Sequence, residues 1–297
     1  MTFKKPLIYI LAILAMLFWG FSFILTSVVF RYYSPVTTVF LRLFISSVIL
    51  FAGIWLFGKM EKVKKGDLKL FLISALFNPF FYFIGESYGL KLTSTTITSV
   101  IIATIPLFTP VAAYFVLGEK MGRLNIFGLV VSFFGLMVML MNNDFSFNAS
   151  PLGILFLFFA VFSAIVYMVY LKKLSHRYSA YFIIAFQNLL GALYFLPFFL
   201  FFDFQGFIAV KPDFTLIASL LSLAIFCSSL AYVFFTISTR EIGIGRTNVF
   251  ANLIPVFTAI FSFLILSEIF SLHKILGILI VVFGLYLSQV KLKDLKA

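Results

Sequence analysis

Ten runs of about 20 or more mainly apolar residues follow one another along this chain, with only short connections between them. A run of that length and composition is what an α-helix needs to cross the hydrocarbon core of a bilayer. A membrane β-barrel would instead alternate apolar and polar residues over segments of about ten residues. The sequence therefore predicts an all-α membrane protein with ten transmembrane helices. The runs cover residues 6–30, 36–57, 68–90, 95–117, 122–141, 151–172, 179–202, 214–238, 244–266 and 272–290.

The composition excludes a soluble fold. Of the 297 residues, 63% are hydrophobic and 11% are charged, whereas soluble domains average about 45–50% apolar and about 25% charged residues. The chain has one cysteine, Cys227, so it can form neither an internal disulfide nor a site built on several cysteines. We expect no metal site and no cofactor.

The positive charges are distributed unevenly between the two sides of the predicted membrane. With the N-terminus inside, 17 Lys and Arg residues fall on inner segments and four on outer segments, and Arg42 lies within a span. Cytoplasmic segments of membrane proteins carry such an excess. The net charge of +12 therefore indicates topology and contact with anionic lipid rather than nucleic acid. We expect a multi-pass protein of the inner (plasma) membrane with both termini cytoplasmic.

The chain contains an internal repeat. A shift of 149 residues aligns Thr98–Thr109 with Thr247–Thr258, and 13 of the 39 pairs that begin within residues 98–136 are identical. The sequence thus divides into a first half, 1–145, and a second half, 146–297, with five predicted spans each. An odd number of spans means that the second half starts on the opposite side of the membrane. Two inverted five-helix repeats of this kind are a common basis of alternating access in secondary transporters.

Several segments of both halves resemble the EamA family of the drug/metabolite transporter superfamily. They are Phe18–Phe23, Arg42, Ile105–Thr109, Leu117–Glu119, Leu253–Thr258 and Leu266–Glu268. The resemblance implies ten helices around a central cavity, lined largely by the first, third, fourth, sixth, eighth and ninth spans. It also implies movement of small metabolites and favours export. The family often has a glycine where this chain has Ser267, which affects only a helix end.

Polar residues within these spans form the predicted substrate site. Buried polar groups in lipid need a partner or a water-filled cavity, and several of them share a helix face at i,i+3 or i,i+4 spacing. For each residue alone, hydrogen bonding between helices is favoured over contact with a ligand, whereas the set as a whole favours a cavity lining. The predicted substrate-binding residues are Trp19, Ser22, Tyr82, Glu86, Ser99, Ser163, Tyr167, Ser228, Tyr232, Asn248 and Asn252.

Glu86 is the only acidic residue well inside a predicted span, and Arg42 lies at a similar depth in the preceding span. An ion pair between them is geometrically feasible, and three roles remain open. The pair can be structural, Glu86 can contact substrate or couple transport to protons, or the two charges can act independently. Pro106 and Pro255 are equivalent in the repeat, and proline permits a helix to bend. We predict that these two prolines gate opposite sides.

These features favour a secondary transporter that moves a small organic metabolite, such as an amino acid or an amphipathic compound, and that works as a monomer. An enzyme is not expected, because the two histidines, His176 and His273, cannot form a zinc-protease motif and no nucleophile elbow is present. A channel and a membrane scaffold without transport activity are the alternatives, and an intramembrane enzyme is less favoured.

Overall fold

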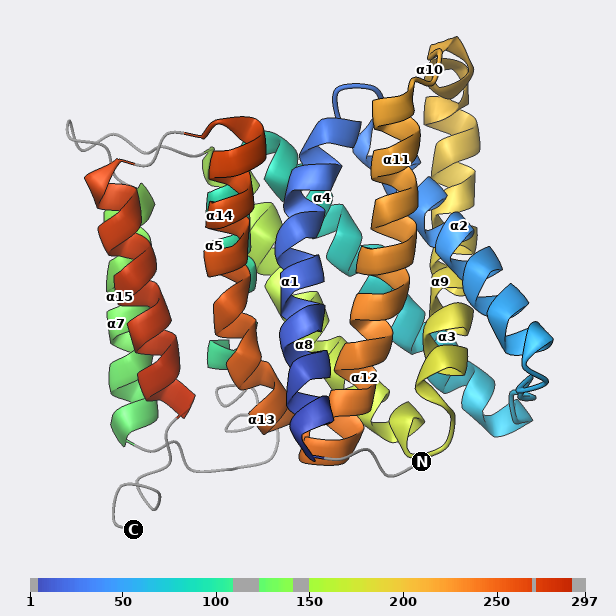
Figure 1. Cartoon of the computed structure of the whole chain (residues 1–297), viewed down its shortest axis with the longest axis horizontal. Coiled ribbons are helices and arrows are strands. Elements are labelled where there is room, and N and C mark those ends of the chain that lie inside the picture. The colour runs from blue at the N-terminus through green and yellow to red at the C-terminus, as the bar shows by residue number, and fades with distance from the viewer. Residues whose placement is uncertain (1–4, 109–122, 141–149, 269–270, 290–297) are drawn as a thin grey trace.

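The computed structural model describes residues 5–108, 123–140, 150–268 and 271–289, and all regular secondary structure within these ranges is helical. The long helices run side by side through one bundle (Figure 1). Seven of them are long and apolar enough to cross a membrane. Three shorter apolar helices, at 95–108, 126–139 and 272–287, coincide with the remaining predicted runs. The chain is therefore a multi-pass α-helical membrane protein.

The helices follow the predicted runs closely. In the first half they are α1 (Lys5–Val29), α2 (Pro35–Leu56), η1 (Lys65–Asp67), α3 (Leu68–Ala75), η2 (Leu76–Phe81), α4 (Tyr82–Leu92), α5 (Thr95–Ile102) and α7 (Arg123–Leu140). In the second half they are α8 (Pro151–Ser175), α9 (Ala180–Phe198), η3 (Phe199–Asp203), α10 (Phe204–Ala209), α11 (Phe214–Ser222), η4 (Leu223–Leu230), α12 (Ala231–Ile242), α13 (Ile244–Val249), η5 (Phe250–Asn252), α14 (Leu253–Leu266) and α15 (Leu272–Gln289). Residues 109–117 of the fourth predicted span, both termini and the predicted boundary at 145/146 lie outside the described ranges.

Short polar side chains define where several helices begin. The side chains of Ser34, Ser94, Ser179 and Asp213 each accept a hydrogen bond from the backbone N–H three residues later. These contacts satisfy donors that the first turn of a helix otherwise leaves free. The polar residues that separate the apolar runs therefore act as N-caps.

The third predicted span is interrupted at its centre. Asn78 has extended backbone angles (φ −144°, ψ 118°) and precedes Pro79 within η2, a π-helical turn between α3 and α4. The residue before a proline is disfavoured in the helical region, and proline cannot donate a helical hydrogen bond. The sequence Asn-Pro thus breaks the helix and leaves the polar side chain of Asn78 near the middle of the bundle.

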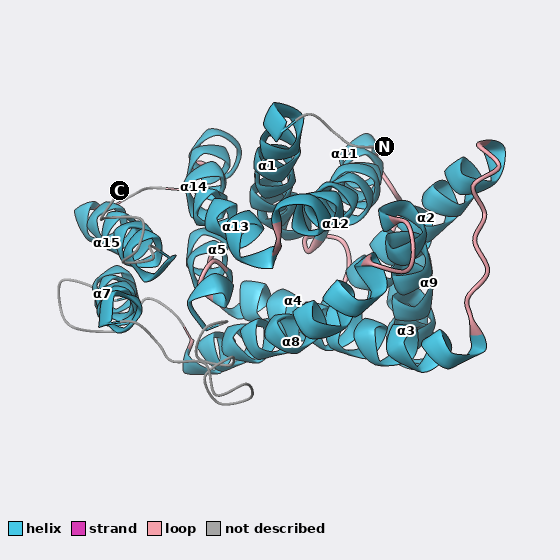
Figure 2. Cartoon of the chain, turned by 90° about the horizontal axis from the view of Figure 1, so that it is seen from below, coloured by secondary structure: helices cyan, strands magenta, loops and turns pink. Residues whose placement is uncertain are grey.

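Contacts between helices connect the two halves of the chain. In the described residues, α2 packs on α9, α4 on α8, α1 on α12 and α14, and α5 on α14. The pair α7 and α15 stands beside these helices as a separate unit (Figures 1 and 2). The described ends of α1 and α15, Lys5 and Gln289, lie on the same side of the bundle (Figure 1).

Glycines let α7 and α15 approach closely. A Cβ atom on Gly135 would come within 2.7 Å of the backbone nitrogen of Val281, and one on Gly284 within 2.5 Å of the backbone nitrogen of Ser132. The Ser132 hydroxyl donates a hydrogen bond of 3.0 Å to the Val281 carbonyl. Small residues at a helix interface permit this backbone approach in membranes.

A carboxylate beyond the end of α14 ties three helices together. Glu268 accepts hydrogen bonds from Thr96 at the start of α5 (2.8 Å), Ser262 on α14 (2.8 Å) and Lys274 on α15 (3.0 Å). Burial alone raises the pKa of this carboxyl, but the hydrogen bonds outweigh burial and hold the pKa below its ordinary value. Glu268 is therefore ionised at neutral pH and fixes α5 against α14.

Candidate functional site

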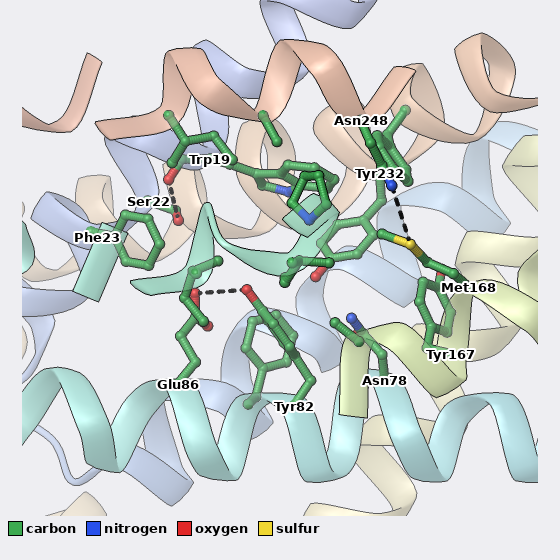
Figure 3. A pocket seen from close by; sticks show the side chains of 18 of the residues that line it. Trp19, Ser22, Phe23, Asn78, Tyr82, Glu86, Tyr167, Met168, Tyr232 and Asn248 are labelled. Carbon is green, nitrogen blue, oxygen red and sulfur yellow. Dashed lines mark hydrogen bonds between the residues drawn. The ribbon is translucent and has the colours of Figure 1, made fainter. Parts of the chain in front are cut away.

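A cavity of about 60 Å³ lies between α1, α2, η2, α4, α5, α8, α12, α13 and α14. Side chains from both halves of the chain point into it (Figure 3). This volume has room for a few water molecules, since one water needs about 10–15 Å³. The lining residues are Trp19, Ser22, Phe23, Arg42, Asn78, Tyr82, Phe83, Glu86, Ile102, Ile105, Pro106, Ala164, Tyr167, Met168, Tyr232, Phe235, Asn248, Ala251 and Ile254.

Aromatic rings form one wall of the cavity. The ring of Trp19 lies 5.0 Å from the ring of Tyr232 and 5.0 Å from the ring of Phe235, between centroids. The indole Nε1 of Trp19 is buried and has no hydrogen-bond partner in the described residues. A buried donor without a partner is energetically costly, and Trp19 lines the cavity (Figure 3). The indole N–H is thus available to an acceptor on a bound molecule.

Among the residues that the structure describes, Glu86 supplies the only carboxyl group of the cavity lining. Glu86 is 6% exposed. Its Oε1 accepts a hydrogen bond of 3.3 Å from the hydroxyl of Tyr82, one turn earlier on α4 (Figure 3). Carboxylates have room for about four hydrogen bonds. The remaining capacity of Glu86 can serve a bound cation or a proton.

Arg42 supplies the only cationic side chain of the lining within the described ranges. Its Nε donates a hydrogen bond of 2.8 Å to Ser228, and its guanidinium carbon lies 4.6 Å from the ring centroid of Phe83. The direct ion pair with Glu86 that the sequence leaves open is not formed, since no charged atoms of the two residues lie within 4.0 Å. The physical reason is that Ser228 and the face of Phe83 already hold the guanidinium. The two charges face the same cavity without touching.

A network of hydrogen bonds outside the cavity lining positions Ser228, the hydrogen-bond partner of Arg42. The amide of Asn188 donates to the Ser46 hydroxyl (2.7 Å) and to the Ser228 carbonyl (3.0 Å). Ser46 and Ser229 are also hydrogen-bonded to each other, at 2.7 Å. These contacts join α2, α9 and η4 and satisfy the buried polar groups that lipid cannot satisfy.

The structure brings most of the predicted site residues together. The cavity is lined by the predicted residues Trp19, Ser22, Tyr82, Glu86, Tyr167, Tyr232, Asn248, Arg42 and Pro106. The predicted residues Ser99, Ser163, Ser228, Asn252 and Pro255 are buried but do not line it.

The residues outside the lining have other surroundings. Ser99 donates a hydrogen bond of 2.8 Å to the carbonyl of Thr96 within its own helix. Ser228 accepts the hydrogen bond from the Nε of Arg42. The Oδ1 atom of Asn252 is buried without a hydrogen-bond partner in the described residues. Helical spacing indicates which residues share a face, but it does not say which of them reach the cavity.

Ten lining residues were not among the predicted site residues. They are Phe23, Asn78, Phe83, Ile102, Ile105, Ala164, Met168, Phe235, Ala251 and Ile254. Asn78 had a detectable signal, since it directly precedes Pro79 in an apolar run. Met168 accepts a contact of 3.5 Å from the amide of Asn248 (Figure 3). The phenylalanines had no signal, because lipid-facing and cavity-facing aromatic residues look alike in a sequence with 44 phenylalanines.

Comparisons with known proteins agree with this architecture. Residues 6–141 and 151–289 match the model of the EamA-like transporter family. An uncharacterized transporter of Archaeoglobus fulgidus is 28% identical over 287 residues, which is 95% of this chain and 97% of that protein. An uncharacterized transporter of Bacillus subtilis, YetK, is 27% identical over 258 residues, 86% of this chain and 78% of that protein. One protein of known crystal structure superposes with a TM-score of 0.72 over 95% of this chain and 98% of its own, at 17% identity, and so shares the fold.

Proposed function

The chain belongs to the EamA-like transporter family, and from that membership we propose that it is a secondary transporter for a small organic molecule, such as an amino acid or an amphipathic compound. Substrate binds in the central cavity and crosses the membrane by alternating access. The observation that carries this proposal is the position of the cavity, which is lined by helices from both matched segments. Sites at the interface of two repeats are typical of such carriers.

The contacts between helices support an inverted repeat of ten helices. Residues 149 apart are equivalent, so Ser132 corresponds to Val281 and Gly135 to Gly284. Gly135 meets the backbone of Val281, and Gly284 meets the backbone of Ser132, which are the two equivalent halves of one contact. The same shift relates α4 to α12 and α1 to α8, and α4 packs on α8 as α12 packs on α1. Both patterns are expected for a two-fold axis between the repeats.

The chemistry of the lining favours substrates with a positive group and an acceptor group. Aromatic faces and one carboxylate attract a cation or an ammonium group. The guanidinium of Arg42 and the free indole N–H of Trp19 offer donors to a carboxylate or carbonyl. Glu86 is the residue that we assign to proton coupling, since it is the only acid among the described residues of the lining. Pro106 lines the cavity and Pro255 is buried nearby on α14, and we assign the bends of opposite gates to them.

The transport proposal is tested with purified protein in liposomes, by measuring uptake of a panel of radiolabelled amino acids and cationic amphiphiles at several pH values. Saturable uptake is expected, and Glu86→Gln is expected to fold but to lose the pH dependence of the rate. The matched control is Glu241→Gln, which makes the same substitution outside this cavity. Gln187→Glu is not suitable as a control, because Gln187 accepts a hydrogen bond from Tyr167, which lines the cavity. Normal pH dependence of Glu86→Gln would make Glu86 structural, and flux that never saturates would indicate a channel.

In the proposed topology the protein lies in the inner membrane and both termini are in the cytoplasm. The family resemblance favours export as the direction of transport. A cysteine at Lys64 is expected to react with a membrane-impermeant maleimide only from the inside, and a cysteine at Asn143 only from the outside, after Cys227 is replaced. The basis is the excess of Lys and Arg on the segments assigned to the inside. Labelling of both positions from one side would contradict ten inverted spans.

A further inference from the structure

A second and larger cavity, of about 820 Å³, opens between the C-terminal part of α2, the start of α9 and the end of α12. We propose that it binds one phospholipid with an anionic headgroup, whose phosphate is held by Lys59 and Arg240. The excess of Lys and Arg assigns these helix ends to the cytoplasmic side of the membrane. The ligand is therefore a lipid of the inner leaflet.

The wall of this groove has the chemistry of a site for an acyl chain. Ile49, Leu50, Ile54 and Ile237 line it. Gly53 lies among them, and a Cβ atom added there would meet no atom within 4 Å. The groove is thus open beside Gly53 and bounded by aliphatic side chains, and a hydrocarbon chain from the surrounding bilayer can fill it without losing any hydrogen bond.

The charges at the mouth favour a phosphate. Lys59 and Arg240 line the groove and are exposed, and neither has a carboxylate within 4.0 Å in the part of the chain that the structure describes. Glu61 also lines the groove, but its Oε1 accepts a hydrogen bond of 3.0 Å from the backbone N–H of Ser179 at the start of α9. Glu241 is the second carboxylate of the lining, and neither carboxylate lies within 4.0 Å of the charged atoms of Lys59 or Arg240, which leaves both cations able to contact a phosphate. Arginine and lysine together are suited to bind phosphate.

This site is separate from the central cavity, since the two share no lining residue. On α12, Tyr232 and Phe235 line the central cavity, whereas Ile237, Arg240 and Glu241 line the groove. At 100° per residue these two sets occupy different faces of the helix. A lipid bound on the outer face of α12 therefore contacts the helix that bears Tyr232 without entering the transport site, and the proposal does not depend on transport.

The test is native mass spectrometry of the full-length protein, released from mixed micelles that contain equal amounts of phosphatidylglycerol and phosphatidylcholine. The wild-type protein is expected to retain one phosphatidylglycerol with about a tenfold preference. Lys59→Ala/Arg240→Ala is expected to lose that preference. The control Lys62→Ala/Lys65→Ala removes the same charge outside the groove and is expected to keep it.

A second variant tests the groove and leaves its charges intact. Gly53→Leu points a side chain into the open space beside α2 and is expected to abolish retention of the lipid, with thermal stability in detergent reported alongside. Equal phosphatidylglycerol retention by the wild type, Lys59→Ala/Arg240→Ala and Gly53→Leu would overturn the proposal. Equal loss in Lys62→Ala/Lys65→Ala would also overturn it, because the preference would then come from the general surface charge.

Discussion

Arg42→Ala is expected to lower the free energy of unfolding by about 3 kcal/mol or more, because it leaves the buried carboxylate of Glu86 without a compensating charge in the same cavity. Arg42 is 2% exposed and, in the part of the chain that the structure describes, is the only cation that lines the central cavity. Without it, the carboxylate of Glu86 faces the cavity with no opposite charge nearby, and Ser228 loses its donor. Thermal unfolding in detergent, followed by size-exclusion chromatography, measures the loss.

Two further variants separate the charge from the contacts. Arg42→Lys keeps the charge but cannot reproduce the planar contact with Phe83, so we expect an intermediate loss. Arg42→Ala/Glu86→Gln removes both charges, and we expect it to regain a large part of the stability although not transport. If the double variant is as unstable as Arg42→Ala, then the hydrogen bond to Ser228, and not the balance of charge, is what Arg42 contributes.

Gly284→Ala and Gly135→Ala are each expected to destabilise the protein by about 1–3 kcal/mol, the usual effect of overpacking a tight contact. A Cβ atom at either position would come within 3.0 Å of the backbone of the partner helix, so the helices themselves must move apart. Because the two contacts are equivalent, their effects should be similar. Thermal unfolding midpoints of the purified variants measure both.

Gly206→Ala is the matched control for these glycine variants, since a Cβ atom there meets nothing within 4 Å. Alanine favours a helix over glycine, so this variant should be at least as stable as the wild type. A loss in Gly206→Ala as large as in Gly284→Ala would mean that the effect is not packing between α7 and α15. A loss at only one of Gly135 and Gly284 would contradict their equivalence.

The helices were predictable because the bilayer imposes a length and a composition on each span. The predicted run 36–57 corresponds to α2 (Pro35–Leu56), and 151–172 to α8 (Pro151–Ser175). The interior of the runs was less predictable. The π-helical turns η2 and η4 lie inside runs that look uniform in hydropathy, and of the two only η2 contains a proline as a signal.

The candidate site was predictable where a residue is rare in lipid. Glu86 and Arg42 stood out because a buried charge is costly in a membrane, and both line the cavity. Their mutual geometry was not predictable, since depth along two helices does not determine how side chains turn about them. Ser99 and Ser163 do not line the cavity. The Ser99 hydroxyl bonds to its own helix, and a sequence gives no sign of such a bond.

The contact between α7 and α15 has a consequence for how the two halves meet. Ser132 and Val281 touch each other, and Gly135 and Gly284 each meet the other helix at the equivalent place. Each of the two helices therefore contacts the other through nearly the same surface, as at the interface of a symmetric dimer. Such an interface carries its own complementarity, and the covalent link between the halves adds only a high effective concentration. At the interface between α7 and α15, the single chain thus behaves as a dimer of its two halves, which are always present in a one-to-one ratio.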